Sequence, residues 1–208
     1  MKLYGFPLSP NTRKVLAVVH ALDLDVELVV VDLVKGEQMK PEFIRLNPNH
    51  KTPTLQDGDF VLWESNAIMQ YLASQKPGNT LWPADPKAQA DISRWQCWQL
   101  AHWGAACEML IFENMLKALL SLGEPDPAEV AKGEERFNIY ATVLDGYLKG
   151  RKWLVGNQVT LADLSVGSYL MYAEAARFPW KPYDEIRRWY TGLEQVEAWK
   201  ASAPPAMA

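Results

Sequence analysis

The 208-residue sequence has the composition of an ordinary globular protein, with 49% hydrophobic and 22% charged residues, which excludes a disordered or collagen-like chain. Its net charge of -4 argues against DNA or RNA as a partner, because nucleic-acid binding needs clustered lysine and arginine. The length is enough for two small domains, each with its own core.

The sequence shows no segment that would address or anchor the protein to a membrane. No apolar run approaches the roughly 18 residues needed to span a bilayer, and the first residues do not form a signal peptide. We therefore expect a cytoplasmic protein. Cys97 and Cys107 fall in one predicted helix, too far apart for a disulfide and outside any metal-ligand spacing. We expect buried free thiols and no metal site.

The first elements predict a parallel pair of strands. Residues 2–6 form a short apolar strand, and Val15, Val18 and Leu22 then recur at helical spacing. Residues 25–32 are rich in β-branched side chains, which favours a buried strand. A strand, a helix and a second strand in this order form a β-α-β unit.

A hairpin and a further helix complete the first domain. A helical turn is predicted over 41–46, and the stretches TPTLQ and FVLW flank Asp57-Gly58, a strong tight-turn signal. From Glu64 the pattern is helical again, until proline and glycine stop it near residue 77. Residues 1–76 therefore predict an α/β domain with the order β-α-β-α-β-β-α.

The remainder of the chain is predicted to be helical. Residues 77–86 are rich in proline and indicate a linker. We expect an all-helical domain over 87–208, with helices at 87–120, 127–149, 160–175, 183–191 and 194–201.

Within this domain, Thr160 and Asp163 have the spacing of a capping box, with Val159 and Leu164 as a hydrophobic staple around it. We interpret this motif as structural.

The stretch SPNTRK permits two interpretations of Ser9. Serine is a preferred N-cap and proline a preferred first helical residue, so Ser9 and Pro10 are adequately explained as a helix start. A hydroxyl at a helix N-terminus also lies beside free backbone N–H groups and can donate to an anion bound there. The two roles are compatible, because capping uses a lone pair and leaves the hydroxyl proton available.

Two further motifs suit an amino-acid-like or peptide-like ligand. A cis bond between Thr52 and Pro53 would turn the Thr52 backbone outward to pair with an extended peptide. Glu64 and Ser65 open a helix, where exposed N–H groups bind carboxylates and Glu64 can neutralise an amine.

Together these motifs resemble the cytosolic glutathione S-transferase family over essentially the whole chain. The resemblance is carried by SPNTRK, NPNHKTPTL and LWESNAIMQYLA, followed by LWPADP and GNQVTLADLSV. It implies a thioredoxin-like N-terminal domain, an all-α C-terminal domain, and a cytoplasmic homodimer that acts in detoxification. It implies glutathione as co-substrate and no other cofactor.

The resemblance also implies roles for single residues. Ser9 is similar to the serine that hydrogen-bonds the glutathione sulfur in the theta and phi classes. The glutathione-binding residues are then Gln38 and Lys51 at the glycine carboxylate, Thr52 and the cis-proline Pro53 at the cysteinyl unit, and Glu64 and Ser65 at the γ-glutamyl end.

The opening motif also resembles the bacterial nu class, in which a related sequence supports glutathione-dependent disulfide reduction. Asn11 is therefore a second candidate for the contact with sulfur. Because a thiolate is the nucleophile in disulfide exchange, and position 9 is serine, any redox activity would use the thiols of glutathione itself.

The leading hypothesis is a transferase that holds glutathione as thiolate for attack on small hydrophobic electrophiles. The alternatives are a disulfide reductase or peroxidase, and a non-catalytic glutathione-binding module. For the hydrophobic substrate the candidates are Phe6, Leu8, Trp103, Met109 and Phe112.

Overall fold

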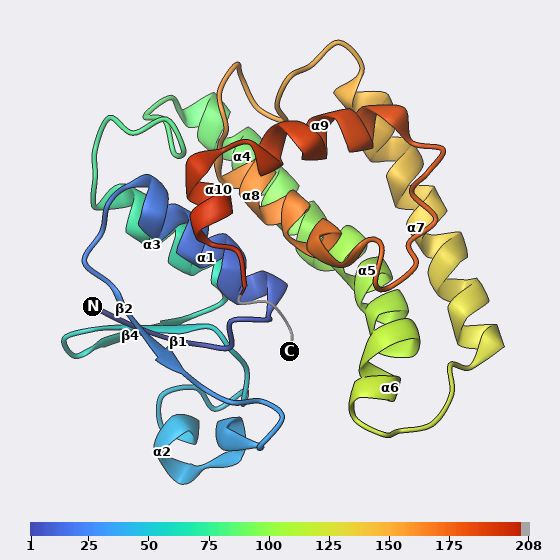
Figure 1. Cartoon of the computed structure of the whole chain (residues 1–208). Coiled ribbons are helices and arrows are strands. Elements are labelled where there is room, and N and C mark those ends of the chain that lie inside the picture. Colours follow the sequence, from blue (N-terminus) through green and yellow to red (C-terminus); the bar gives the residue numbers. More distant parts are fainter. Residues whose placement is uncertain (205–208) are drawn as a thin grey trace. The chain divides into compact units, whose positions relative to one another are not determined.

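The structure, a computed structural model, describes residues 1–204 and forms two compact units (Figure 1). The first unit contains Met1–Ala84 together with the segment from Val196 onward, and the second contains Asp85–Gln195. The sequence-based boundaries were 1–76, 77–86 and 87–208. The final helix, α10 (Glu197–Ala201), lies in that expected helical domain by sequence but packs on α1 (Pro10–Ala21) of the first unit.

The first unit is built on a four-stranded sheet of order β2-β1-β3-β4. The strands are β1 (Lys2–Gly5), β2 (Glu27–Val30), β3 (Thr54–Asp57) and β4 (Phe60–Trp63). β1 pairs with β2 in parallel and with β3 antiparallel, and β3 pairs antiparallel with β4 across the predicted Asp57-Gly58 turn. With α1, η1 (Glu37–Met39), α2 (Pro41–Ile44) and α3 (Ser65–Ser74), this confirms the predicted thioredoxin-like order.

The alternation of side chains along β1 separates the two faces of the sheet. Leu3 is fully buried, as is its cross-strand neighbour Leu55. Gly5, which shares the face of Leu3 by alternation, approaches Thr12 of α1. Figure 1 shows α1 and α3 together on one side of the sheet. Tyr4 points to the other face, where its ring meets Phe43 of α2 edge-on at 6.5 Å. β1 is a central strand of the sheet and α1 is the next element of the chain, so α1 begins near the C-terminal end of a central strand.

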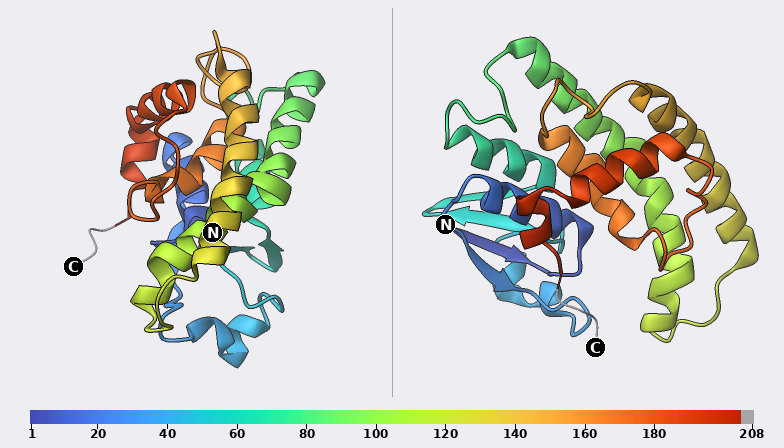
Figure 2. Two further views of the ribbon diagram at one scale, coloured as in Figure 1. Left: turned by 90° about the vertical axis from the view of Figure 1, so that its right-hand side faces the viewer. Right: turned by 45° about the horizontal axis from the view of Figure 1, so that its top comes forward.

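The second unit is helical throughout its regular structure. Its elements are α4 (Pro86–Trp98), η2 (Gln99–Trp103), α5 (Gly104–Ile111), η3 (Phe112–Leu116), α6 (Lys117–Leu119), α7 (Pro127–Leu148), α8 (Leu161–Gly167), η4 (Ser168–Tyr172) and α9 (Asp184–Glu194). The helix predicted over 87–120 runs through α4 to α6, interrupted by two π-helical segments, η2 and η3. In the views of Figure 2, α7 runs beside α5.

Aromatic side chains and one buried carboxylate organise the core of the second unit. Trp103 packs on Phe137 with ring centroids 4.8 Å apart. The capping box at the start of α8 is present as predicted: Thr160 accepts from the backbone of Ala162, and Asp163 accepts from the backbone of Thr160. The residues described here contain no helix with the length and apolar character needed to cross a bilayer.

Candidate functional site

Ser9 stands where β1 gives way to α1, and its hydroxyl does not cap the helix. Its backbone is extended, with φ -79° and ψ 127°, and its side chain makes no capping hydrogen bond. Its carbonyl accepts from the N–H of Arg13 at 2.9 Å, which opens the first turn, with Pro10 at the start of the helix. Ser9 therefore occupies the N-cap position of α1, but its side chain does not cap the helix.

The turn between β1 and α1 is held by a very close approach. The backbone N–H of Phe6 donates to Oγ1 of Thr12 at 3.2 Å. A Cβ atom added to Gly5 would lie 2.6 Å from Cγ2 of Thr12, which is closer than real contacts allow. Glycine at position 5 is thus required by packing, and it lets the first turn of α1 sit against the end of the strand.

Polar contacts join the first turns of α1 and α3. The hydroxyl of Ser65 donates to Oδ1 of Asn11 at 3.3 Å, and Nζ of Lys14 donates to Oδ1 of Asn66 at 2.8 Å. The first contact joins Asn11, a candidate for the glutathione sulfur, to Ser65, a candidate for the γ-glutamyl end. Since a helix N-terminus is the positive end of the helix dipole, the starts of α1 and α3 favour a negatively charged ligand.

The loop before β3 presents Thr52 through a buried amide that the sequence analysis missed. Asn47 is only 2% exposed, and its Nδ2 donates to the carbonyl of Lys51 at 2.8 Å and to Oγ1 of Thr54 at 3.1 Å. The bond between Thr52 and Pro53 is cis, as the family resemblance implied. In the sequence, asparagine next to proline indicates a turn. The side-chain hydrogen bonds of Asn47 therefore could not be predicted from the sequence.

Two non-glycine residues of the site have left-handed backbones. Glu64, exposed at the N-cap of α3, has φ 72° and ψ 107°, and His50 has φ 57°. Such conformations cost about 1 to 3 kcal/mol and concentrate at ligand-binding sites. Glu64 is exposed at the start of the helix that also carries Ser65, which is 9% exposed.

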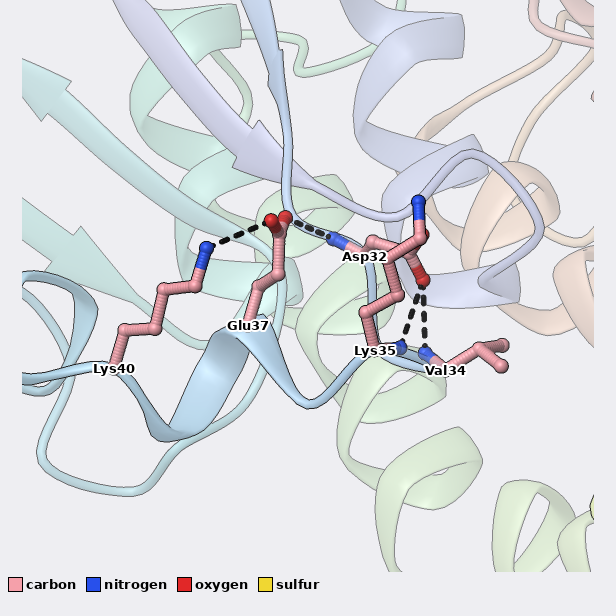
Figure 3. Close-up of polar contacts among 5 residues, drawn as sticks. All are labelled: Asp32, Val34, Lys35, Glu37 and Lys40. Carbon is pink, nitrogen blue, oxygen red and sulfur yellow. Dashed lines mark hydrogen bonds and ion pairs between the residues drawn. The ribbon is translucent and has the colours of Figure 1, made fainter.

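Gln38 lies on η1, in a loop shaped by charged contacts on both sides (Figure 3). The carboxylate of Asp32 accepts from the backbone N–H groups of Val34 and Lys35, and Glu37 accepts from the backbone of Asp32 at 2.9 Å and from Lys40 at 2.8 Å.

These contacts hold the acidic groups of the loop in their charged form. The hydrogen bond from the side chain of Lys35 lowers the pKa of Asp32, and the bond from Lys40 lowers that of Glu37. Oε1 of Gln38, the residue after Glu37, is buried without a hydrogen-bond partner among the described residues. An acceptor placed in this way has capacity left for a ligand.

The five hydrophobic candidates have different surroundings. Phe6 and Leu8 are half-buried in the first unit, whereas Trp103 is fully buried in the second, where its Nε1 donates to the carbonyl of Val166 at 3.0 Å. Trp103 is therefore a core residue with no exposed surface for a substrate.

The other two candidates in the second unit keep some exposure. Met109 is half-buried, and Phe112 is 41% exposed. As substrate contacts, Phe6, Leu8, Met109 and Phe112 stay predictions.

The cysteines are not part of this site. Cys107 is buried as expected, and burial raises the pKa of its thiol. Cys97 is exposed, which corrects the expectation that both thiols are buried, because it lies on the outer side of α4. Within residues 1–204 no three His, Cys, Asp or Glu side chains gather in a way that would hold a metal ion.

Comparisons with known proteins agree over both units. Residues 1–74 match the family model described as glutathione S-transferase, N-terminal domain, and residues 104–197 match the corresponding C-terminal domain. Glutathione S-transferase 3 of Zea mays is 40% identical over 165 residues, covering 78% of this chain and 73% of the relative. A glutathione S-transferase of Hyoscyamus muticus is 35% identical over 203 residues, covering 97% and 92%.

Solved structures give the same result. Glutathione transferase F7 from Populus trichocarpa has a TM-score of 0.86 at 30% identity, covering 97% of this chain and 96% of its own. A delta-class glutathione transferase of Nilaparvata lugens has a TM-score of 0.84 at 30% identity, covering 97% and 92%.

Proposed function

We propose that Ser9 activates the glutathione thiol. The premise is that this chain belongs to the glutathione S-transferase family and has glutathione transferase activity. The observation that carries the proposal is the hydroxyl of Ser9, which stands at the N-terminus of α1 and is not used to cap it. The hydroxyl donates a hydrogen bond to the sulfur and keeps its proton, and the sulfur is held as thiolate at the N-terminus of α1, the positive end of the helix dipole.

The remaining residues of the site bind the rest of glutathione. Glu64 neutralises the γ-glutamyl amine, while Ser65 and the N-terminus of α3 receive the adjacent carboxylate. The backbone of Thr52, presented by the cis bond to Pro53 and the amide of Asn47, pairs with the cysteinyl unit.

The far end of glutathione is assigned to two further residues. The glycine carboxylate lies near Lys51 and Gln38, the first an exposed cation and the second flanked by the charged loop of Figure 3.

The strength of one hydrogen bond is sufficient for this task. A hydrogen bond to a charged group contributes about 1.5 to 3 kcal/mol, and one pKa unit corresponds to about 1.4 kcal/mol. Ser9 therefore accounts for a lowering of the thiol pKa by about one to two units, with up to roughly one more from the helix terminus. A thiol with a pKa of about 8.5 then ionises near neutral pH.

The thiolate attacks an electrophilic carbon, forming the sulfur–carbon bond and releasing the leaving group. Apolar surface from Phe6, Leu8, Met109 and Phe112 is proposed to favour small hydrophobic electrophiles. The reaction as proposed uses glutathione as its co-substrate and needs no further cofactor. A homodimer located in the cytoplasm is the proposed working form, and sedimentation of the purified protein tests whether it is a dimer.

A second candidate function is glutathione-dependent disulfide reduction, favoured by the position of Asn11. Its Oδ1 accepts from Ser65, which fixes the orientation of the side-chain amide in the first turn of α1. In this reaction one glutathione thiolate attacks the disulfide and releases a thiol, and a second glutathione then releases the other thiol and leaves oxidised glutathione.

The test measures glutathione binding and the thiolate absorbance of bound glutathione in the parent protein and in Ser9→Ala, with Asn11→Ala beside it. Loss of thiolate at neutral pH in Ser9→Ala supports the proposal, and undiminished thiolate overturns it in favour of Asn11. Ser74→Ala, an exposed serine at the other end of α3, is the matched control.

The reaction type follows from rates with two substrates. Faster turnover of hydroxyethyl disulfide than of chlorodinitrobenzene supports the second candidate. Binding of glutathione without turnover of either substrate would support a non-catalytic binding module.

A further inference from the structure

The last helix of the chain makes a tight contact with the helix that carries Ser9. The guanidinium carbon of Arg13, on α1, lies 4.0 Å from the ring centroid of Trp199, on α10. Nη2 of Arg13 also donates to the backbone carbonyl of Trp199 at 3.4 Å. In Figure 1 α10 lies beside α1 within the first unit.

Burial makes this contact stronger than an ordinary surface stack. Trp199 is fully buried and Arg13 is 8% exposed, although arginine is rarely buried without specific partners. The carbonyl of Trp199 accepts a second hydrogen bond, at 2.8 Å, from the hydroxyl of Ser202, which is 3% exposed. A cation over a tryptophan ring is worth more when water is excluded. The pair is therefore a specific clamp, not an incidental contact.

The clamp acts on the turn that presents the site. The backbone N–H of Arg13 donates to the carbonyl of Ser9, so the two residues share the first hydrogen bond of α1. On α3, Ser65 and Asn66 hold the same turn through Asn11 and Lys14. The first turn of α1 is thus tethered to α3 and, through Arg13, to the end of the chain.

We propose that Arg13 and Trp199 are positioning residues that fix the Ser9 hydroxyl at hydrogen-bond distance from the glutathione sulfur. This inference rests on the proposed function of Ser9. Because the side chain of Ser9 makes no capping bond, its position is set by the backbone of the first turn. Hydrogen bonds weaken steeply with distance and angle, so a small shift of this turn reduces thiolate stabilisation and leaves the peptide-binding contacts in place.

The experiment compares Arg13→Ala, Arg13→Lys, Trp199→Phe and the control Lys200→Ala. Lys200 is on α10 beside Trp199, but its exposed side chain pairs with Glu197 of the same helix. For each protein the pKa of the bound glutathione thiol is measured by thiolate absorbance against pH. Affinity for S-methylglutathione, which has no thiol, is measured in parallel.

We expect Arg13→Ala to raise the pKa of the bound thiol by about one unit, which is at least half of the lowering attributed to the hydrogen bond from Ser9. Affinity for S-methylglutathione should change less than about twofold, because the backbone of Thr52 is untouched. Arg13→Lys should restore part of the effect by keeping a cation over the ring, and Lys200→Ala should match the parent.

An unchanged thiol pKa in Arg13→Ala, with only lower thermal stability, would overturn the proposal and leave the clamp a folding contact. If Arg13→Ala does not fold, Trp199→Phe decides, because it keeps the apolar core and the backbone carbonyl but offers a weaker ring to the cation. Failure of the clamp is distinct from failure of the proposed function, since Ser9→Ala reports the latter independently.

Discussion

Two helix starts in this protein use similar residues for opposite purposes. Thr160 begins α8 and caps it through its hydroxyl, whereas Ser9 begins α1 and leaves its hydroxyl out of the helix. Around Thr160 the polar groups satisfy one another: Asp163 accepts from Leu154, Thr160 and Trp189. Around Ser9 the hydroxyl makes no capping hydrogen bond, and the starts of α1 and α3 are joined by the hydrogen bond from Ser65 to Oδ1 of Asn11. Polar groups whose hydrogen bonds are all made within the protein indicate a structural role. Polar groups that can still make hydrogen bonds indicate a role in ligand binding.

The largest effect on stability is expected at Asp163, where the surrounding polar groups all have hydrogen-bond partners. Asp163→Ala leaves buried donors on Leu154, Thr160 and Trp189 without an acceptor, at about 1 to 3 kcal/mol for each unsatisfied group. We expect a loss of about 3 to 5 kcal/mol in the free energy of unfolding, measured with urea. Asp163→Asn keeps one acceptor and should lose less; an equal loss in both variants would contradict this explanation.

The same carboxylate should give stability a characteristic dependence on pH. Burial raises the pKa of Asp163 from 3.8 to about 6, against the opposing hydrogen bonds from Leu154 and Thr160. Between these two values the folded protein holds a proton that the unfolded chain has lost. This contribution to stability is therefore present below about pH 4 and is lost as the pH rises through about 6, on the order of 3 kcal/mol in total.

The pH effect is isolated by comparison with Asp163→Asn, which has no titrating group at this position. The urea-unfolding free energy of the parent, minus that of the variant, should fall between pH 4 and pH 6. The subtraction removes the contributions of Asp32, Glu37 and Glu113, whose lowered pKa values act in the opposite direction. A flat difference would show that Asp163 titrates normally.

Paired alanine variants at the two helix starts test the comparison directly. Ser9→Ala should lower kcat/KM about 10- to 100-fold, because a hydrogen bond to a thiolate contributes about 1.5 to 3 kcal/mol, while the unfolding free energy stays within about 0.5 kcal/mol. Thr160→Ala should lose about 1 kcal/mol of stability and keep its kcat/KM. Chlorodinitrobenzene kinetics and urea unfolding measure both, and a reversed pattern would refute the distinction.

The smallest expected effect concerns backbone strain in the site. Glu64→Gly should stabilise the protein by about 1 kcal/mol, since φ 72° suits glycine, and should weaken glutathione binding because the carboxylate is lost. Glu64→Gln keeps the strained backbone, so it should weaken binding without the gain in stability. Thermal unfolding and calorimetric titration with glutathione distinguish the two variants.

Local patterns in the sequence were sufficient for most of the fold. The hairpin at Asp57-Gly58 and the capping box of Thr160 and Asp163 depend on a few neighbouring residues, and both are present as predicted. The long helix was predicted as a single element, because apolar periodicity does not reveal the π-helical segments η2 and η3.

The candidate site also has one part that local sequence patterns predict and another part that they do not. The motifs around Ser9, Thr52 and Glu64 are readable because helix starts and X-Pro bonds have local signatures. The supporting contacts are not readable: Asn47 reaches Lys51 and Thr54 through a buried amide, and the left-handed backbone of Glu64 has no signal in its residue type.

The sequence by itself predicted where most helices and strands begin, and its resemblance to the glutathione S-transferase family implied which residues are candidates to hold glutathione. Only the tertiary structure decided how those residues are used. It freed the hydroxyl of Ser9 from capping, buried Trp103 in the core and brought Trp199 onto Arg13, 186 residues away. The physical reason is range: capping and periodicity act over a few residues, whereas burial and hydrogen-bond capacity depend on neighbours that only the folded chain supplies.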